Sequence, residues 1–215
     1  MSKLQDTDPP LDCPLCPRLV SYLNDARQKY PDWHNAPVPN WSAPSPRLMI
    51  VGLAPGLKGA NRTGRPFTGD WAGDLLYQTL VKFDFAKGNY GKSREDGLEL
   101  TDAIIVNAVR CVPPENKPIG AEINNCRPFL RATVEQTTSV QCVVALGGIA
   151  HNSFLTLFDV KKKDFKFGHG NEHQLPNGTL LIDSYHCSRY NTNTGRLTEE
   201  MFENIFSRVR EIVGK

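Results

Sequence analysis

The sequence predicts an α/β protein, a three-layer α/β/α sandwich with a central four-stranded parallel sheet. Four short apolar runs, each ended by polar residues or glycine, are typical of strands buried on both faces. Amphipathic helical patterns lie between these runs, and strands that alternate with helices indicate a parallel sheet covered on both sides. The chain has 215 residues, enough for one domain with a sizeable core.

The individual elements follow from the same patterns. Residues 1–12 are polar and contain prolines, which predicts a flexible tail ahead of a single domain at 13–215. Residues 15–30 have a helical apolar face, and the proline-rich residues 31–46 predict an extended segment that wraps over the core. Strands are expected at 48–51, 103–106, 142–146 and 179–182. Helices are expected at 70–83, 121–137, 148–158 and 198–213, the last with Thr198 as its N-cap.

Composition limits the classes of function. The formal net charge is only +2, so a nucleic-acid partner must contact a local basic patch. No apolar run approaches the roughly 20 residues that span a bilayer, so no membrane partner is expected. The first residues lack a basic stretch followed by an apolar one, which argues against a signal peptide. We therefore expect a cytoplasmic protein, where disulfides are rare.

The six cysteines then need another explanation. Cys13-Pro-Leu-Cys16 is a close pair, and Cys111 and Cys126 flank a proline-rich loop. Four thiolates from two distant segments can hold either a [4Fe–4S] cluster or zinc, and the spacing leaves both open. A third alternative is a set of unrelated buried thiols. Cys142 lies in an apolar run and is expected in the core.

Polar residues and glycines follow each predicted strand. These segments are Gly52-Leu-Ala-Pro-Gly56, Asn107, Gly147-Gly148 and the segment from Asp183 to Asn191 that contains His186. Carboxyl ends of parallel strands meet at one edge of the sheet, where ligands bind. Asn107 offers both a donor and an acceptor, as recognition of a base edge requires. His186 is either part of an enzyme site here or a residue that merely caps a strand.

The loop from Gly59 to Asp70 is rich in glycine and carries one aromatic residue, Phe67. A flat ring beside backbone amides is a stacking platform for a flat substrate. The alternative is a surface loop anchored to the core by Phe67. The loop is not a phosphate-binding P-loop, because no Gly-Lys-Ser/Thr follows its glycines.

Taken together, these motifs resemble the iron–sulfur uracil-DNA glycosylases of family 5, or type b. The resemblance rests on Gly52-Leu-Ala-Pro-Gly56, Gly64-Arg-Pro-Phe-Thr-Gly-Asp70, Asn107-Ala-Val-Arg-Cys111, His186-Cys-Ser-Arg-Tyr-Asn191 and the four cysteines. The motifs agree in order over roughly residues 13–198. The resemblance implies a four-stranded parallel sheet and a structural [4Fe–4S] cluster on Cys13, Cys16, Cys111 and Cys126. It also implies a monofunctional, monomeric enzyme that acts on uracil and other deaminated bases, including hypoxanthine, in the DNA of a bacterial or archaeal nucleoid.

The resemblance also assigns roles in the base pocket. Glycosylases extrude the target nucleotide from the stack. Phe67 would stack on the base, Asn107 would hydrogen-bond its edge, and His186 would donate to its carbonyl oxygen as it departs. The first motif, with Gly52, Ala54 and Gly56, would contact the base. This chain has Leu53 where many relatives place a polar residue that holds the water, so Asp70 is our candidate for that role, with Asp74 as second choice. Asp70 also suits a helix N-cap.

Contacts with DNA are expected from two regions. The segment Ser188, Arg189, Tyr190 and Asn191 would enter the minor groove, with Tyr190 as the wedge that fills the vacated stack. The alternative is that Arg189 and Tyr190 are only exposed loop residues. The motif has Cys187 where relatives have proline, so a fixed φ is lost and a looser loop is expected. Phosphate contacts are expected from Arg62, Arg65 and Arg196.

Three classes of function remain in competition. The first is a DNA repair glycosylase that leaves an abasic site. The second is a non-catalytic iron–sulfur protein of the same fold that binds nucleic acid, for which the altered His186 motif leaves room. The third, a metal-bearing hydrolase of free nucleotides, lacks support because no carboxylate-rich metal site is visible.

Overall fold

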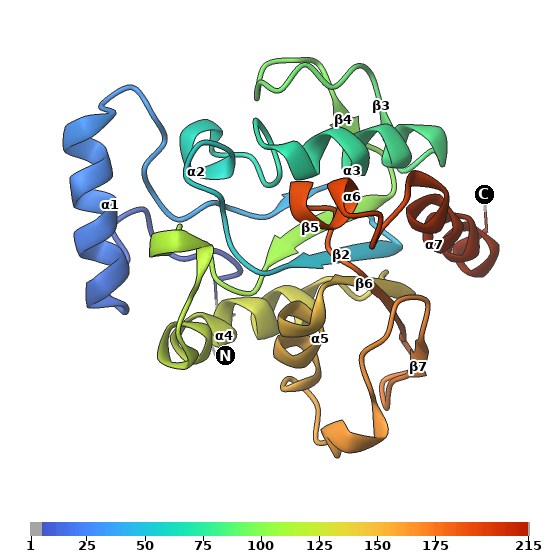
Figure 1. Ribbon diagram of the computed structural model, residues 1–215. Coiled ribbons are helices and arrows are strands. Elements are labelled where there is room, and N and C mark those ends of the chain that lie inside the picture. The colour runs from blue at the N-terminus through green and yellow to red at the C-terminus, as the bar shows by residue number, and fades with distance from the viewer. Residues whose placement is uncertain (1–5, 215) are drawn as a thin grey trace.

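A parallel sheet lies at the centre of the computed structural model, which describes residues 6–214 (Figure 1). Four strands of this sheet run parallel in the order β5-β2-β6-β8. Three of them are buried at every position, as their apolar runs predicted. The predicted α/β/α sandwich with a four-stranded parallel core is therefore confirmed. The strands are β2 (Leu48–Gly52), β5 (Ala103–Asn107), β6 (Cys142–Leu146) and β8 (Leu180–Ser184).

Two short antiparallel strands extend the sheet to six. One is β1 (Trp41–Ser42), which pairs with β5, and the other is β7 (Glu172–Gln174), which pairs with β8. The sequence did not predict either strand. Two or three residues carry too little hydrophobic pattern to be recognised, and their pairing is decided by the neighbouring strand.

Helices cover both faces of the sheet. Along β2, Leu48 and Ile50 pack with α3 (Trp71–Lys82) and α7 (Glu199–Val213), whereas Met49 and Val51 pack with α4 (Gly120–Gln136) and α5 (Gly148–Leu155). This alternation follows from the two-residue period of a strand. Figure 1 shows the two helical layers on opposite sides of the sheet.

The predicted helices form with small shifts at their ends. Thr198 is the N-cap of α7, and its side chain accepts a hydrogen bond from Met201 N at 3.1 Å. In contrast, α5 ends at Leu155, three residues before the predicted end, although Phe158 still packs against the core. Apolar spacing indicates which residues are buried, and here the buried positions continue beyond the end of the helix. The first helix is α1 (Pro17–Lys29), and the remaining short elements are α2 (Ala60–Thr63), β3 (Ala86–Lys87), β4 (Glu99–Leu100), η1 (Pro114–Asn116), η2 (Lys162–Asp164) and α6 (Arg189–Asn193).

The predicted flexible tail at residues 1–12 needs correction. Residues 1–5 lie outside the described part of the chain. Asp8 accepts hydrogen bonds from the Arg110 guanidinium at 2.6 Å and from Asn40 N at 2.9 Å. Arg110 is fully buried, so its charge requires a partner. Asp8 supplies that partner, which binds this part of the segment to the domain.

No helix within residues 6–214 has the length and apolar character that crossing a membrane requires.

Candidate active site

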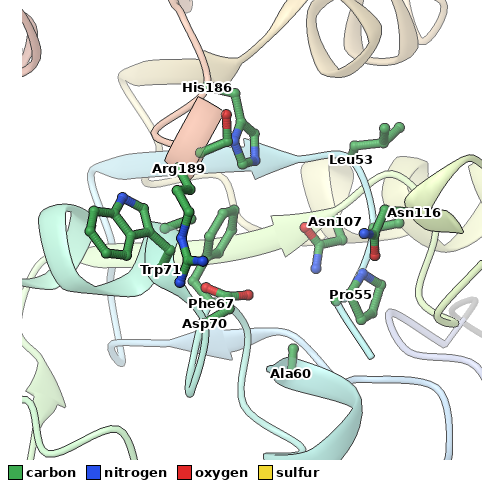
Figure 2. A pocket seen from close by; sticks show the side chains of 14 residues that line it. Leu53, Pro55, Ala60, Phe67, Asp70, Trp71, Asn107, Asn116, His186 and Arg189 are labelled. Carbon is green, nitrogen blue, oxygen red and sulfur yellow. The ribbon is translucent and has the colours of Figure 1, made fainter. Parts of the chain in front are cut away.

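A cavity of about 340 Å³ opens at the carboxyl edge of the parallel strands. The loops after β2, β5 and β8, together with the N-terminus of α3, form its wall, as parallel strand order requires. Figure 2 shows the side chains of Phe67, Asp70, Asn107 and His186 around this space. The sequence assigned these four residues to one site, and the structure brings them together. The complete lining is Leu53, Ala54, Pro55, Gly56, Ala60, Phe67, Asp70, Trp71, Ala72, Asn107, Asn116, His186, Ser188 and Arg189.

Gly52 lies behind the pocket wall. It pairs with Asn107 in the register of β2 and β5. A Cβ at Gly52 would lie 2.3 Å from Asn107 Oδ1 and 2.7 Å from Phe67 Cζ. Of the predicted base-contacting residues in this motif, Ala54 and Gly56 line the cavity, whereas Gly52 makes room for two others that do.

Asn107 is a nearly buried amide in the pocket wall, with 3% of its surface exposed. Its Oδ1 has no hydrogen-bond partner among the described residues. A buried acceptor without a partner costs about 1–3 kcal/mol, and such groups in native proteins usually have a reason. A ligand with an N–H group would supply the missing bond.

Phe67 lies where both alternatives for its loop would place it. It belongs to the core cluster with 7% exposure, and it also lines the cavity. Its centroid lies 6.0 Å from that of the His186 ring. The φ of Phe67 is +51°, a strained value for a bulky residue. The Tyr90 hydroxyl donates to Phe67 O at 3.2 Å and accepts from Gly69 N at 3.0 Å, which holds the loop in this conformation.

His186 lies in the cavity wall as a neutral imidazole. Burial lowers its pKa to about 4, because the surrounding protein replaces the water that would solvate the charge. Cys187 is fully buried in the core, and Asn191 Nδ2 donates to His186 O at 2.8 Å. These contacts anchor the loop, although the fixed φ of a proline is absent. Asn191 thus holds the His186 backbone, a role that the sequence did not predict.

Asp70 is the N-cap of α3, which confirms one of its two predicted roles. Its Oδ1 accepts from Gly73 N at 3.1 Å. The carboxylate also lines the cavity, and a Cβ at Gly59 would lie only 2.5 Å from Oδ2. Burial raises the pKa of Asp70, while backbone N–H groups at the helix start oppose that rise. Asp74, the second choice, is absent from the cavity wall and pairs with Lys92 at 2.8 Å.

The predicted minor-groove segment forms α6 beside the cavity. The Ser188 hydroxyl accepts from Asn191 N at 3.4 Å as the N-cap. The Arg189 guanidinium lies over the Trp71 ring, 4.8 Å from its centroid, and lines the cavity. Tyr190 is 71% exposed, which leaves its ring accessible to a partner. Arg196 is exposed and stacks on Tyr185.

The prediction that Arg65 contacts phosphate is wrong. It is only 4% exposed and forms two hydrogen bonds with the Asp96 carboxylate, at 2.7 and 2.8 Å. Its guanidinium also stacks on Trp41, 4.7 Å from the ring centroid. A guanidinium held in this way cannot reach DNA. The partner, Asp96, lies far along the chain, so the glycine-rich context of Arg65 gave no sign of it.

Among the lining residues that sequence reasoning missed, two carry polar groups, Asn116 and Trp71. Asn116 lies at the end of η1, in the loop between Cys111 and Cys126, with a φ of +56°. Figure 2 shows it beside Asn107. It lies nine residues beyond the end of β5, so the rule that located residues directly at strand ends does not reach it. Trp71 follows Asp70 and was predicted only as part of a helix. Its indole Nε1 donates to Thr192 Oγ1 at 3.0 Å, which ties α3 to α6.

One small cavity beside α1 is lined by all four predicted ligand cysteines, Cys13, Cys16, Cys111 and Cys126. Leu19, Val109 and Phe129 also line it. Burial, reinforced by the neighbouring cysteines, raises the pKa of Cys111 to about 12. Arg110 N donates to Cys126 Sγ at 3.3 Å, and Asn125 Nδ2 donates to Cys16 Sγ at 3.7 Å. Two of the four sulfurs therefore receive N–H bonds, the kind of outer contact that metal-bound thiolates also receive. The free space is about 20 Å³, so the side chains must turn outward to hold a group of several atoms.

A second group of metal-ligand residue types occurs among residues 6–214. The ligand atoms of His151, His173 and Asp183 lie within 4.8 Å of one another. They already bind each other: Asp183 contacts His151 Nδ1 at 2.6 Å and His173 Nε2 at 3.1 Å. His151 Nε2 lies 2.9 Å from Phe165 O. This group joins α5, β7 and β8 just before the His186 loop.

Comparisons with known proteins identify the family of this chain. The family model described as the uracil DNA glycosylase superfamily matches residues 39–210. The chain is 39% identical to a type-5 uracil-DNA glycosylase of Thermus thermophilus, over 94% of each chain. It is 40% identical to a type-5 enzyme of Mycobacterium leprae, over 94% of this chain and 92% of the relative. A type-5 enzyme of Pyrobaculum aerophilum is 38% identical over 95% and 90% of the two chains. The chain therefore belongs to the uracil-DNA glycosylase superfamily.

Proposed function

We propose that this protein is a DNA repair glycosylase that extrudes uracil from DNA and hydrolyses its N-glycosidic bond, leaving an abasic site. One observation carries the proposal: Phe67, Asp70, Asn107 and His186, from three separate segments of the chain, surround a single cavity. The type-5 relatives support the same activity. Every group of the proposed site comes from one chain, so we propose that a monomer is active.

Each residue has a chemical task in this proposal. Phe67 stacks on the extruded base, and Asn107 exchanges hydrogen bonds with its edge. When the bond between C1′ and the base nitrogen breaks, the electron pair leaves with the base. His186, neutral because of its low pKa, donates a hydrogen bond to the carbonyl oxygen on which that charge accumulates. Water adds to C1′, and Asp70 holds this water, accepts its proton and balances the charge of the sugar cation.

We extend the proposal to hypoxanthine. The cavity of about 340 Å³ lies in the range of pockets that hold small organic ligands, so it has room for a bicyclic base. The two amides in its wall, Asn107 and Asn116, each offer a donor and an acceptor and therefore suit more than one base edge.

A panel of oligonucleotides tests the function. Each duplex carries one uracil, hypoxanthine or xanthine, or an undamaged base, and alkali converts any abasic product into a strand break. We expect cleavage at uracil, weaker cleavage at hypoxanthine and none at undamaged bases. Binding of uracil DNA without cleavage would instead support the non-catalytic alternative.

We propose that Cys13, Cys16, Cys111 and Cys126 hold a structural [4Fe–4S] cluster. When bound, it would cross-link the segment before α1 to the loop that carries Asn116 and to α4. The gathering of the four cysteines at one apolar cavity, with N–H donors to two of their sulfurs, supports this assignment over an unrelated set of thiols.

Replacing Cys126 by Ala is expected to lower the iron content from about four per chain and to reduce the melting temperature, since metal binding is coupled to folding. Cys142→Ala is the matched control. Cys142 is also buried but lies in β6, so iron content should not change. Metal analysis of anaerobically purified protein gives the readout, and stoichiometric zinc would contradict the cluster.

Tyr190→Ala should weaken activity on duplex substrate more than on single-stranded substrate, because only a duplex leaves a hole to fill. Tyr190 is 71% exposed, so its removal should leave the melting temperature unchanged. Single-turnover rates on both substrates measure the effect. Equal losses on the two would exclude a wedge.

A further inference from the structure

A second open pocket, of about 540 Å³, lies beside the loop that carries Phe67. Three cations, Arg62, Lys92 and Arg94, line it, and we call this surface the basic cleft. Two carboxylates, Asp32 and Glu95, lie at the same pocket. The remaining lining residues are Trp33, His34, Thr63 and Ser93.

Two of the cations are free to bind a ligand. Lys92 pairs with Asp74 at 2.8 Å, and the Glu95 carboxylate accepts a hydrogen bond from Ser93 at 2.7 Å. The guanidinium groups of Arg62 and Arg94 have no carboxylate partner among the described residues. An anion that enters the cleft therefore meets two exposed guanidiniums whose donors are unoccupied, and these suit the geometry of a phosphate.

The backbone makes room for these side chains. Gly64 has a φ of +73°, and a Cβ there would lie 2.9 Å from His34 Nδ1 and 3.3 Å from Arg94 Nη1. Gly69 has a φ of +88°, and a Cβ there would lie 2.7 Å from Arg62 Nη2. Glycines at two positions of the Phe67 loop thus allow the arginines to lie against it.

Buried Arg65 holds the two sides of the cleft together. Its pairing with Asp96 joins residues 62–65 to residues 92–96, and its Nη1 lies 3.4 Å from Arg94 O. Asp96 also accepts from Gly91 N at 2.9 Å. Arg65, which does not reach DNA itself, is therefore a positioning residue for the guanidiniums that line the cleft.

The same loop serves the base pocket. Phe67 and Asp70 line that cavity, while Gly69, adjacent to Asp70, lies against Arg62 of the basic cleft. A nucleotide that enters the base pocket leaves its flanking phosphates outside, and the loop that borders this pocket also borders the basic cleft.

We propose that the basic cleft binds backbone phosphates of the DNA strand that carries the extruded nucleotide, and that it does so without reading sequence. This inference rests on the proposed function. Contacts of this kind position a protein on DNA and make its affinity depend on salt.

The test uses the double variant Arg62→Gln/Arg94→Gln and a duplex whose single deoxyuridine carries a 2′-fluoro group that resists cleavage. The slope of log affinity against log salt should decrease by about two, and affinity at 0.1 M salt should fall on the order of tenfold to hundredfold. The matched control is Lys161→Gln/Lys163→Gln, which removes the same charge from an exposed segment around η2, on the other side of the molecule in Figure 1. Its slope should equal that of the wild type. Equal slopes in all three proteins, or equal losses in both variants, would overturn the proposal.

A second measurement locates the phosphates. Duplexes are made with a neutral methylphosphonate at single positions on either side of the lesion. Wild-type affinity should fall at one or two adjacent positions, and the arginine variant should be insensitive there while keeping its sensitivity elsewhere. If the variant keeps the wild-type pattern, the cleft does not contact the backbone. If the protein binds DNA in this pattern but cleaves no lesion, the proposed function fails and the phosphate site stands.

Free phosphate is the other possible occupant. If millimolar inorganic phosphate stabilises the wild type but not the double variant, while all three proteins show the same salt slope for DNA binding, the cleft holds a free anion and the DNA contact is overturned. Melting temperatures measured in parallel should be the same for the wild type and both variants, because the substituted side chains are exposed.

Discussion

Replacing His186 by Ala is expected to lower the single-turnover rate on uracil DNA about a hundredfold to a thousandfold, the usual effect of losing one oxyanion donor. The affinity for DNA should change little, because the hydrogen bond strengthens only as charge develops on the departing base. His186 partly lines an existing cavity, so the variant should keep its fold. Rapid-quench kinetics with enzyme in excess separate the two effects, and a change below about threefold would remove His186 from the mechanism.

The low pKa of His186 makes the stability of the folded protein depend on pH. A folded pKa of about 4 lies below the ordinary value of 6.5, so the unfolded chain binds this proton first as pH falls. The stability contributed by the neutral imidazole is therefore complete above about pH 6.5 and is lost progressively toward pH 4. The His186→Ala variant should lose less stability than the wild type across this window. In the pH range 7 to 8 the wild-type rate should show no step from this group.

Asp70→Asn is the second change with a large expected effect, a rate loss on the order of a hundredfold or more with little change in melting temperature. The amide keeps an oxygen that can accept from Gly73 N as a helix cap, but it cannot accept the proton of water or balance a sugar cation. Asp70→Ala should lose rate and also about 1 kcal/mol of stability, the usual cost of a missing cap. Comparing the two variants separates capping from catalysis.

Asp74→Asn serves as the control for Asp70. Asp74 lies one turn later on α3, is absent from the cavity wall and pairs with exposed Lys92. Its rate should remain within about twofold of the wild type. An Asp70→Asn variant as fast as the wild type would leave Asp70 as a helix cap only, and the water would then be held by another group, such as the backbone carbonyls after β2.

The sequence alone was sufficient to predict the parallel core and the main residues of the cavity. Strands buried on both faces must be apolar throughout, so their boundaries are visible as short runs, and parallel order delivers their ends to one edge. This reasoning assigned Asn107 and His186 to the same site. It left the core contact and the cavity contact of Phe67 as alternatives, and the structure shows that this side chain makes both.

Only the tertiary structure decided which polar residues face solvent. The roles of Arg62 and Arg65 could not be distinguished in the sequence, yet Arg62 is exposed whereas Arg65 is buried against Asp96. Asn116 lines the cavity from a long loop, nine residues beyond the end of β5, where the sequence pattern marks no site. The apolar pattern along the chain reports burial within each element, and it therefore determined the fold and the sheet edge that forms the site. Ion pairs and loop contacts join residues far apart along the chain, so no local pattern encodes them, and they became known only when the folded chain brought the partners together.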